Sequence, residues 1–354
     1  MVKDISFELD GKTVTAQPGE TIWQVAKRCG TSIPHLCHSD KPGYRSDGNC
    51  RACMVEIDGE RVLAASCIRT PAQDMKVTSK SERARKAREM VFELLVTDQP
   101  ARETSHDPKS QFWTWADAMG VGASRYPARQ APPADTSHTA ISVNLDACIQ
   151  CNLCVRACRE VQVNDVIGMA YRGSNAKVIF DFDQGMGSST CVACGECVQV
   201  CPTGALMESS LLDGNGTRTE YPDRTVDTLC PYCGVGCQTT VHVKDDKILY
   251  IDGRDGEANQ NRLCVKGRFG FDYINHPHRL TKPLIRRDDA PKSVNCEVDP
   301  ANPLTHFREA TWEEALARAA TGFSAVLAES GPQALAGFGS AKGSNEEAYL
   351  FQKL

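Results

Sequence analysis

The chain has 354 residues, enough for two or three domains, and its formal net charge of −5 argues against nucleic acid as the main partner. Its 18 cysteines are too sparse for a small disulfide-stapled scaffold, so we expect metal or redox use in a reducing compartment. With no export signal and no membrane-spanning stretch in the sequence, we expect a soluble cytoplasmic protein.

Residues 1–80 predict a small α+β domain. Alternating apolar residues around an Asp-Gly turn predict a hairpin over residues 2–17, and Thr21 begins a helix that carries a buried Cys29. Met54–Ile57 and Arg61–Leu63 predict a second hairpin.

Four cysteines of this domain have a spacing that suits a [2Fe–2S] cluster: Cys37, Cys50, Cys53 and Cys67. The central CxxC lies in a glycine-bearing loop, whose N–H groups can hydrogen-bond the sulfurs and tune the cluster. A four-cysteine zinc site is the alternative on spacing alone. We expect the neighbouring His35 and His38 to be loop residues, because four cysteines already complete the set. The segment resembles the β-grasp [2Fe–2S] domain that opens the large iron–sulfur subunit of respiratory complex I and related hydrogenases.

Residues 81–140 predict a helix and a linker. The amphipathic helix, Ser79–Val96, is expected to turn Leu94 inward and to place Arg88 on a solvated basic face. Beyond it, prolines and lost periodicity predict a connector with one aromatic anchor, Phe112-Trp-Thr-Trp115.

Residues 141–210 contain two matched CxxCxxCxxxC runs, which predict a ferredoxin-like domain with two [4Fe–4S] clusters. In this spacing the fourth cysteine of each run serves the other cluster. The predicted ligands are Cys148, Cys151, Cys154 and Cys201 for one cluster, and Cys191, Cys194, Cys197 and Cys158 for the other. Disulfides and zinc fit poorly, because the cysteines are too closely spaced to pair and zinc ligands usually come from two hairpins.

Residues 222–282 predict a small β-rich domain with a third [4Fe–4S] cluster. The predicted ligands are Cys230, Cys233, Cys237 and Cys264. Between them, Thr239–Val243 and Ile248–Ile251 predict a hairpin that returns the chain to the cluster. A zinc ribbon is the alternative on spacing, but a ferredoxin-like pair directly upstream favours an electron carrier.

Residues 283–354 predict the start of an α/β domain. Thr311 caps a helix that turns Leu316 inward, Ala334–Phe338 is a short strand, and Ser344 caps another helix. The loop between the strand and the last helix can present N–H groups to phosphate through Gly339, Ser340, Lys342 and Gly343.

The CPYCGVGC motif at Cys230–Cys237, with Arg262–Phe269 downstream, resembles the start of a molybdopterin oxidoreductase catalytic subunit. Joined to the complex-I-like N-terminus, the chain is similar to the N-terminal part of the α subunit of cytoplasmic NAD-dependent formate dehydrogenases. The resemblance implies one [2Fe–2S] and three [4Fe–4S] clusters, and a molybdenum or tungsten bis-molybdopterin guanine dinucleotide in the complete subunit. It places Lys266 between the last cubane and a pterin, and the Gly339–Gly343 loop beside the guanine dinucleotide.

The resemblance also implies electron transfer from formate toward a partner subunit with FMN that reduces NAD. In the family the metal-bound cysteine or selenocysteine comes later in the chain, so we expect no catalytic residue here and no formate turnover by this polypeptide alone. Complex-I-like relatives carry a further cluster with one histidine ligand, but no cysteine lies between Cys67 and Cys148, so we expect His106 to be an ordinary surface histidine. The alternatives are a non-catalytic relay subunit of a complex-I-like or hydrogenase-like assembly, and a multi-zinc scaffold.

Overall fold

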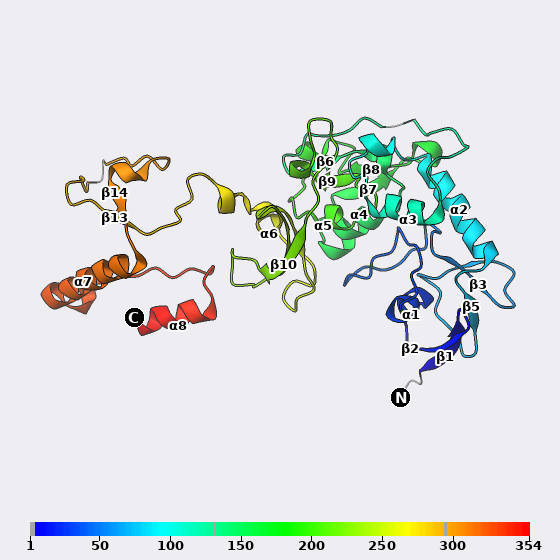
Figure 1. Ribbon diagram of the computed structural model, residues 1–354, viewed down its shortest axis with the longest axis horizontal. Coiled ribbons are helices and arrows are strands. Elements are labelled where there is room, and N and C mark those ends of the chain that lie inside the picture. Colours follow the sequence, from blue (N-terminus) through cyan, green and yellow to red (C-terminus); the bar gives the residue numbers. More distant parts are fainter. Residues whose placement is uncertain (1–3, 131, 294–295) are drawn as a thin grey trace. The chain divides into compact units, whose positions relative to one another are not determined.

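The computed structural model describes residues 4–130, 132–293 and 296–354 (Figure 1). The chain divides into two compact units, of which unit 1 is Met1–Cys230 with Cys237–Phe269, and unit 2 is Pro231–Gly236 with Gly270–Leu354. Within the described ranges, no helix combines the length and the apolar character needed to cross a bilayer.

Unit 1 begins with a five-stranded sheet in the order β2-β1-β5-β3-β4 and one helix, α1. The elements are β1 (Ile5–Leu9), β2 (Lys12–Ala16), α1 (Ile22–Arg28), β3 (Met54–Ile57), β4 (Ala64–Ala65) and β5 (Lys76–Thr78). The first hairpin and the Thr21 capping box are confirmed, and Ile22 and Val25 pack from α1 into the core under the sheet.

Two expectations for this domain are wrong. Arg61–Leu63 does not form the second strand, because β3 pairs with the later Ala64–Ala65 while its other edge pairs with β5. Cys29 is exposed, since it follows the last residue of α1 and lies off the buried face of the helix.

The predicted helix is present as α2 (Glu82–Val96), but its buried face differs from the prediction. Arg88 is buried, because its guanidinium donates to Ser79 O at 2.6 Å, and it lies in line with the buried Phe92. Leu94 is 51% exposed and therefore faces away from the core. Helical periodicity alone places an arginine on the exposed face. Arg88 can be buried because the backbone carbonyl of Ser79 accepts a hydrogen bond from its guanidinium.

The predicted connector contains a further helix, α3 (Gln111–Met119). Ser110 caps its first turn and Gly120, at φ 70°, ends it. Phe112 is fully buried and packs against Phe92 of α2 with ring centroids 5.8 Å apart. The aromatic anchor is thus the buried face of a helix rather than part of an irregular linker.

The ferredoxin-like part of unit 1 is built from two short antiparallel strand pairs and small helices. The elements are β6 (Ile141–Val143), α4 (Leu153–Arg156), β7 (Ile167–Ala170), β8 (Lys177–Phe180), α5 (Glu196–Gln199) and β9 (Leu206–Glu208). Strands β6 and β9 pair antiparallel, with Ile141 opposite Glu208, so the two ends of this segment lie side by side. A π-helical turn, Ala157–Val161, follows α4 and carries Cys158.

Unit 1 ends with an antiparallel three-stranded sheet and a short helix, labelled in Figure 1 as β10 and α6. The elements are β10 (Arg224–Leu229), β11 (Gln238–Lys244), β12 (Lys247–Gly253) and α6 (Val265–Phe269). The predicted hairpin corresponds to β11 and β12. Strand β10 was missed because every residue in it is exposed, so it lacks the alternation that marks a half-buried strand.

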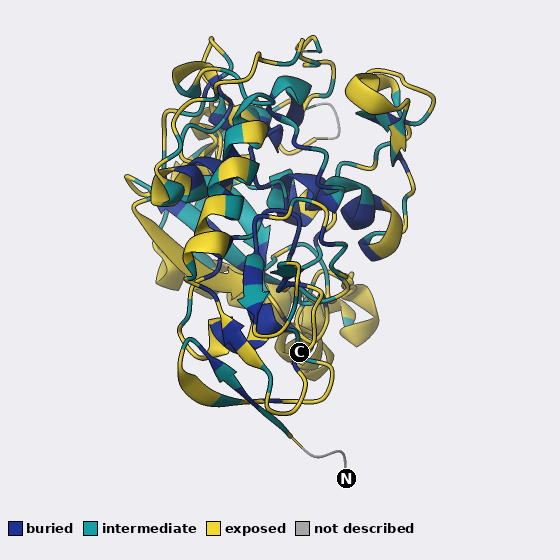
Figure 2. Ribbon diagram, turned by 90° about the vertical axis from the view of Figure 1, so that its right-hand side faces the viewer, coloured by how far each residue is buried: buried dark blue, intermediate teal, exposed yellow. Residues whose placement is uncertain are grey.

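The described residues of unit 2 form one strand pair and two α-helices: β13 (Leu284–Arg286), β14 (Phe307–Glu309), α7 (Trp312–Ser330) and α8 (Asn345–Lys353). Both predicted caps are present, with Glu314 N donating to Thr311 Oγ1 at 3.2 Å and Glu347 N to Ser344 Oγ at 3.2 Å. Neither helix buries any side chain, and the helical ribbon near the C-terminus is coloured exposed in Figure 2. Leu316 is therefore exposed rather than inward. Ala334–Phe338 is not a strand, because Pro332 opens a 3-10 turn that runs into its first residue and no described strand pairs with it.

Candidate metal centres

The four cysteines of the N-terminal domain converge on one point. The Cys37 thiol shares hydrogen bonds with the Cys50 and Cys67 thiols, and Cys53 shares one with Cys67. Cys37, Cys53 and Cys67 are buried, and Cys50 is half-buried. The structure therefore brings together all four cysteines predicted to hold the [2Fe–2S] cluster.

This convergence favours a thiolate at Cys37. Hydrogen bonds from the thiols of Cys50 and Cys67 lower the pKa of Cys37 to about 2. The hydrogen bond to Cys37 raises the pKa of Cys50, and bonds to Cys37 and Cys53 raise the pKa of Cys67. The thiolate is the form that binds iron, so the arrangement suits a metal group with positive charge.

In the ferredoxin-like part, the eight cysteines line two separate cavities. One cavity is lined by Cys148, Cys151, Cys154 and Cys201, and the other by Cys158, Cys191, Cys194 and Cys197. Each cavity thus takes three cysteines from one run and the fourth from the other run. This is the crossed grouping that the spacing predicts.

The two runs repeat the same loop geometry. Gln150 and Ala193 occupy equivalent positions, both at φ 54°, and their N–H groups donate to Cys148 Sγ at 3.4 Å and to Cys191 Sγ at 3.3 Å. Left-handed turn residues aim successive backbone N–H groups toward a common point, which suits sulfur atoms that carry negative charge. In the N-terminal domain, Ala52 N donates to Cys50 Sγ at 3.5 Å in the same two-residue pattern.

Burial opposes ionisation of these thiols in the absence of a cation. Desolvation raises the pKa of Cys148 to about 11, and it raises the pKa values of Cys154 and Cys197 well above their usual range. Metal binding displaces the thiol protons, so buried cysteines aimed into one cavity fit a bound metal cluster better than free thiols. Among the described residues, no three His, Cys, Asp or Glu side chains are close enough together to bind a single metal ion. An iron–sulfur cluster does not require this, because its cysteine ligands bind different iron atoms.

Three of the four cysteines predicted to hold the third [4Fe–4S] cluster, Cys230, Cys237 and Cys264, belong to unit 1. Cys230 follows β10 and Cys237 precedes β11, and Cys230 N donates to Cys237 O at 2.8 Å. Gly267 of α6 lies against Cys230, since a Cβ atom there would be 3.6 Å from Cys230 Sγ. The exposed Cys264 immediately precedes α6, whereas Cys233 belongs to unit 2.

The residues predicted to contact a pterin lie in both units. Lys266 is exposed on α6 of unit 1. In unit 2, Gly234 N donates to Ala341 O at 2.7 Å, so the segment with Cys233 contacts the Gly339–Gly343 loop. Within that loop the N–H of Lys342 donates to Ser340 Oγ at 3.1 Å and that of Gly343 to Ser340 O at 3.1 Å, so neither is directed at a phosphate in this conformation.

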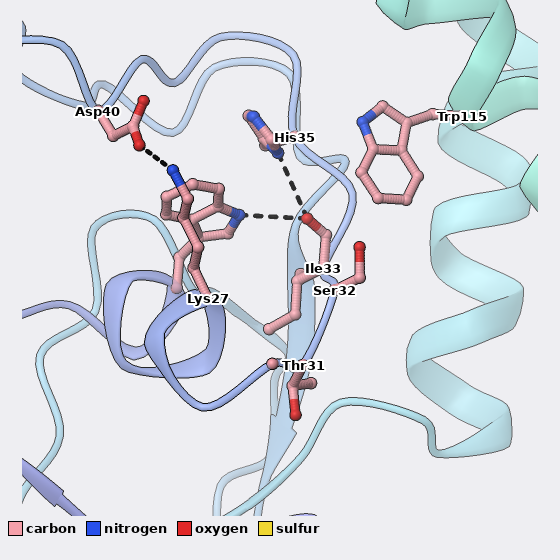
Figure 3. Close-up of a pocket in the computed structure, with 9 residues that line it drawn as sticks. Lys27, Thr31, Ser32, Ile33, His35, Asp40 and Trp115 are labelled. Atoms are coloured by element: carbon pink, nitrogen blue, oxygen red, sulfur yellow. Dashed lines mark hydrogen bonds and ion pairs between the residues drawn. The ribbon is translucent and has the colours of Figure 1, made fainter.

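Of the two histidines near Cys37, His35 lines a surface pocket and His38 is buried. The pocket has a volume of about 340 Å³ and lies between Trp23, His35 and Trp115 (Figure 3). Trp23 Nε1 donates to Ile33 O at 3.1 Å, while Lys27 and Asp40 form an ion pair across its rim. His35 pairs with Gln111 and the buried His38 with Ser46, which agrees with their assignment as loop residues.

His106 is buried, contrary to the prediction of a surface residue. Its Nδ1 lies 3.1 Å from Gly204 O, three residues beyond Cys201, and its backbone carbonyl accepts from Arg218 N at 2.8 Å. The ring therefore fastens the loop that follows the second cysteine run.

Sequence reasoning also missed Arg156 and Arg268, which have the two largest fully buried side chains in the described part of the chain. Each lies a few residues from a cysteine of a predicted ligand set, but nothing local distinguishes them from surface arginines. Their partners come from distant segments that only the fold brings together.

Four family models match the chain in succession. Residues 2–82 match the 2Fe-2S iron-sulfur cluster binding domain, residues 147–205 the 4Fe-4S dicluster domain, residues 223–276 the molybdopterin oxidoreductase Fe4S4 domain, and residues 279–354 the molybdopterin oxidoreductase model. The order of iron–sulfur and molybdopterin oxidoreductase domains expected from the motifs is thereby confirmed.

The whole chain is similar to curated proteins with one shared name. It is 30% identical to a Staphylococcus haemolyticus protein named "Putative formate dehydrogenase" and 28% identical to a Staphylococcus aureus (strain USA300) protein of the same name. Both alignments cover 100% of this chain and 38% of the relative, so the chain spans less than half of their length. These matches confirm the predicted resemblance to the N-terminal part of formate dehydrogenases.

A solved structure is also similar. It is a crystal structure of an NAD+-reducing [NiFe]-hydrogenase in the H2-reduced state, with 28% sequence identity and a TM-score of 0.51. The match covers 58% of this chain and 88% of the hydrogenase chain.

Proposed function

We propose that this chain is the electron-transfer part of a formate dehydrogenase catalytic subunit. The observation that carries the proposal is the pair of crossed four-cysteine cavities, set in a chain that also matches [2Fe–2S] and molybdopterin oxidoreductase domains. When bound, iron–sulfur clusters take up and release single electrons. A molybdenum or tungsten pterin site oxidises formate to carbon dioxide and releases two electrons and a proton.

The proposed ligand sets follow the four groups of cysteines. Cys37, Cys50, Cys53 and Cys67 hold a [2Fe–2S] cluster, the two crossed sets hold two [4Fe–4S] clusters, and Cys230, Cys233, Cys237 and Cys264 hold a third. The chain's own contribution is to orient these thiolates, exclude water by burial and supply N–H donors to the sulfurs. Those three features set the potential of each centre.

At the other end, Lys266 and the Gly339–Gly343 loop are proposed to meet the bis-molybdopterin guanine dinucleotide of the complete subunit. The ammonium of Lys266 is placed two residues after Cys264, where a fixed cation favours the reduced states of groups on either side. The contact between Gly234 and Ala341 supports the proposal, because it joins the loop to the segment that carries Cys233.

The proposed partner is an iron–sulfur subunit with FMN that reduces NAD in the cytoplasm. The similarity to a chain of an NAD+-reducing hydrogenase supports a partner of this class. The alternative, a non-catalytic relay subunit of a hydrogenase-like assembly, draws on the same similarity. The molybdopterin oxidoreductase matches over residues 223–276 and 279–354 favour the dehydrogenase.

Formate-driven dye reduction tests the proposal. The reconstituted chain alone is expected to be reduced by dithionite but not by formate, whereas a polypeptide extended to the length of the curated relatives and loaded with pterin cofactor reduces the dye with formate. Activity of the extended polypeptide with nitrate and none with formate would assign it to another molybdopterin enzyme. Absence of any molybdenum- or tungsten-dependent activity would favour the non-catalytic relay.

A further inference from the structure

The buried Arg156 connects the N-terminal domain to the first cysteine run. Its side chain is 2% exposed and donates from Nη2 to Cys37 O at 2.9 Å and to Cys151 O at 3.3 Å. Its Nη1 donates to Arg45 O at 2.9 Å and pairs with Asp47 Oδ2 at 2.8 Å. One guanidinium thus holds the backbone of two cysteines from two different proposed clusters.

The buried Arg268 makes the corresponding connection on the other side. Its side chain is fully buried and donates from Nε to Cys194 O at 3.3 Å. Its Nη1 donates to Ile251 O at 2.9 Å and to Asp252 Oδ1 at 2.9 Å, and its Nη2 lies 3.7 Å from Glu196 Oε2. It therefore ties the second cysteine run to strand β12 of the third cluster domain.

The two contacts are equivalent by the internal repeat of the chain. Cys151 and Cys194 are both the second cysteine of their run, and each offers its carbonyl to a buried guanidinium. In both runs, the residue two positions after the third cysteine also forms a junction, that is, a contact between its run and a neighbouring domain. This residue is Arg156 in the first run and Gln199 in the second. Gln199 Oε1 accepts from Gly253 N at 3.0 Å, so it docks the same strand that Arg268 holds.

The side chain of Arg268 also leaves no room for a Cβ atom at position 195. Gly195 has φ 70°, and a Cβ atom there would lie 2.8 Å from Arg268 Cγ. The close approach brings the buried cation directly onto the loop between Cys194 and Cys197.

We propose that Arg156 and Arg268 are positioning residues that fix the spacing between neighbouring clusters and raise the reduction potentials of the two clusters on either side of each junction. The inference rests on the proposed electron-transfer function. A cluster gains one negative charge on reduction, so a buried cation nearby stabilises the reduced state. The guanidinium also donates hydrogen bonds to backbone carbonyls of the two segments that it joins, which keeps these segments at a fixed separation.

The experiment compares Arg156→Met and Arg268→Met by redox titrations of the reconstituted full chain, monitored by electron paramagnetic resonance. Arg156→Met is expected to shift the [2Fe–2S] cluster and the Cys148 cluster to more negative potential and to leave the other two in place. Arg268→Met is expected to shift the Cys191 and Cys230 clusters instead. Arg85→Met, which removes an exposed arginine paired with Glu89, is the control for overall charge.

The lysine variants separate charge from geometry and cover the case in which a methionine variant fails to fold. Arg156→Lys and Arg268→Lys keep the charge but lose the multiple hydrogen bonds, so potentials stay close to wild type while the magnetic coupling between the two joined clusters weakens. The inference would be overturned if both methionine variants kept their potentials and both lysine variants kept their coupling. It would also be overturned if the potentials shifted equally in all variants, including Arg85→Met. A wild-type chain without cluster signals would instead refute the proposed function itself.

Discussion

At the scale of single residues, His106 anchors the loop that follows the second cysteine run. Its ring is buried and pairs with Gly204 O, and Gly204 itself adopts φ 74°. Burial lowers the pKa of His106, and the hydrogen bond to Gly204 only partly offsets this effect. The folded chain therefore holds the histidine neutral.

This pKa shift predicts a pH dependence of stability. The unfolded chain binds the His106 proton more readily, so the free energy of unfolding falls as the pH drops through the unfolded value of about 6.5. His106→Gln can still donate to Gly204 O and is expected to flatten this loss in urea titrations at pH 7.5, 6.5 and 5.5. His278→Gln, at an exposed position of unit 2, is the control, and an equal pH slope in His106→Gln and wild type would contradict the account.

Gly195 gives a second prediction at this scale. Alanine at a left-handed position costs about 1 kcal/mol, and contact with the Arg268 side chain adds an overpacking cost of about 1–3 kcal/mol. Gly173, at φ 62° with no atom within 4 Å of an added Cβ, supplies the matched control. Gly195→Ala should lower the free energy of unfolding clearly more than Gly173→Ala, and equal losses in urea denaturation would show that the close contact is not rigid.

At the scale of elements, the two cysteine runs are the best-predicted part of the chain. Their spacing fixes which cysteines can share a cavity, because two-residue gaps confine three thiols to one loop and send the fourth to the other cavity. The short helices α4 and α5 and the equivalent left-handed residues Gln150 and Ala193 then shape both loops alike. Local sequence was sufficient here, since nearly all the constraints are local.

The crossed grouping predicts that mutating the fourth cysteine of one run removes the cluster held mainly by the other run. Cys201→Ser should remove the cluster held mainly by the first run, and Cys158→Ser should remove the cluster held mainly by the second. The exposed Cys29→Ser is the control that changes a cysteine without touching a cavity. Iron content and electron paramagnetic resonance spectra report the loss, and loss of the cluster in the mutated run itself would exclude crossed ligation.

Where prediction failed, the missing information was tertiary. Arg88 was expected on the solvated face of α2, but its acceptor Ser79 O comes from outside the helix. Strand β10 has no buried residue and so no periodic signal, and its existence depends on pairing with β11. Ala334–Phe338 has the composition of a strand but no described partner strand to pair with.

At the scale of the whole molecule, unit 1 gathers the [2Fe–2S] and ferredoxin-like domains and most of the third cysteine set into one compact body. One buried core joins Leu36 of the N-terminal domain, Phe112 of the missed helix α3 and Ile141 of β6. The motifs identified the chemistry of each domain from sequence. The contacts that join the domains, through Arg156 and Arg268, could not be predicted because they link residues 119 and 74 positions apart in the sequence.

The central claim is that this chain holds four iron–sulfur clusters, and metal analysis of the anaerobically reconstituted chain tests it most directly. One [2Fe–2S] and three [4Fe–4S] clusters correspond to about 14 iron atoms per chain, with matching sulfide and little zinc. Electron paramagnetic resonance after dithionite reduction should resolve signals of both cluster types. Zinc in place of iron would contradict the account, and about 18 iron atoms would show a further cluster that the four cysteine sets do not explain.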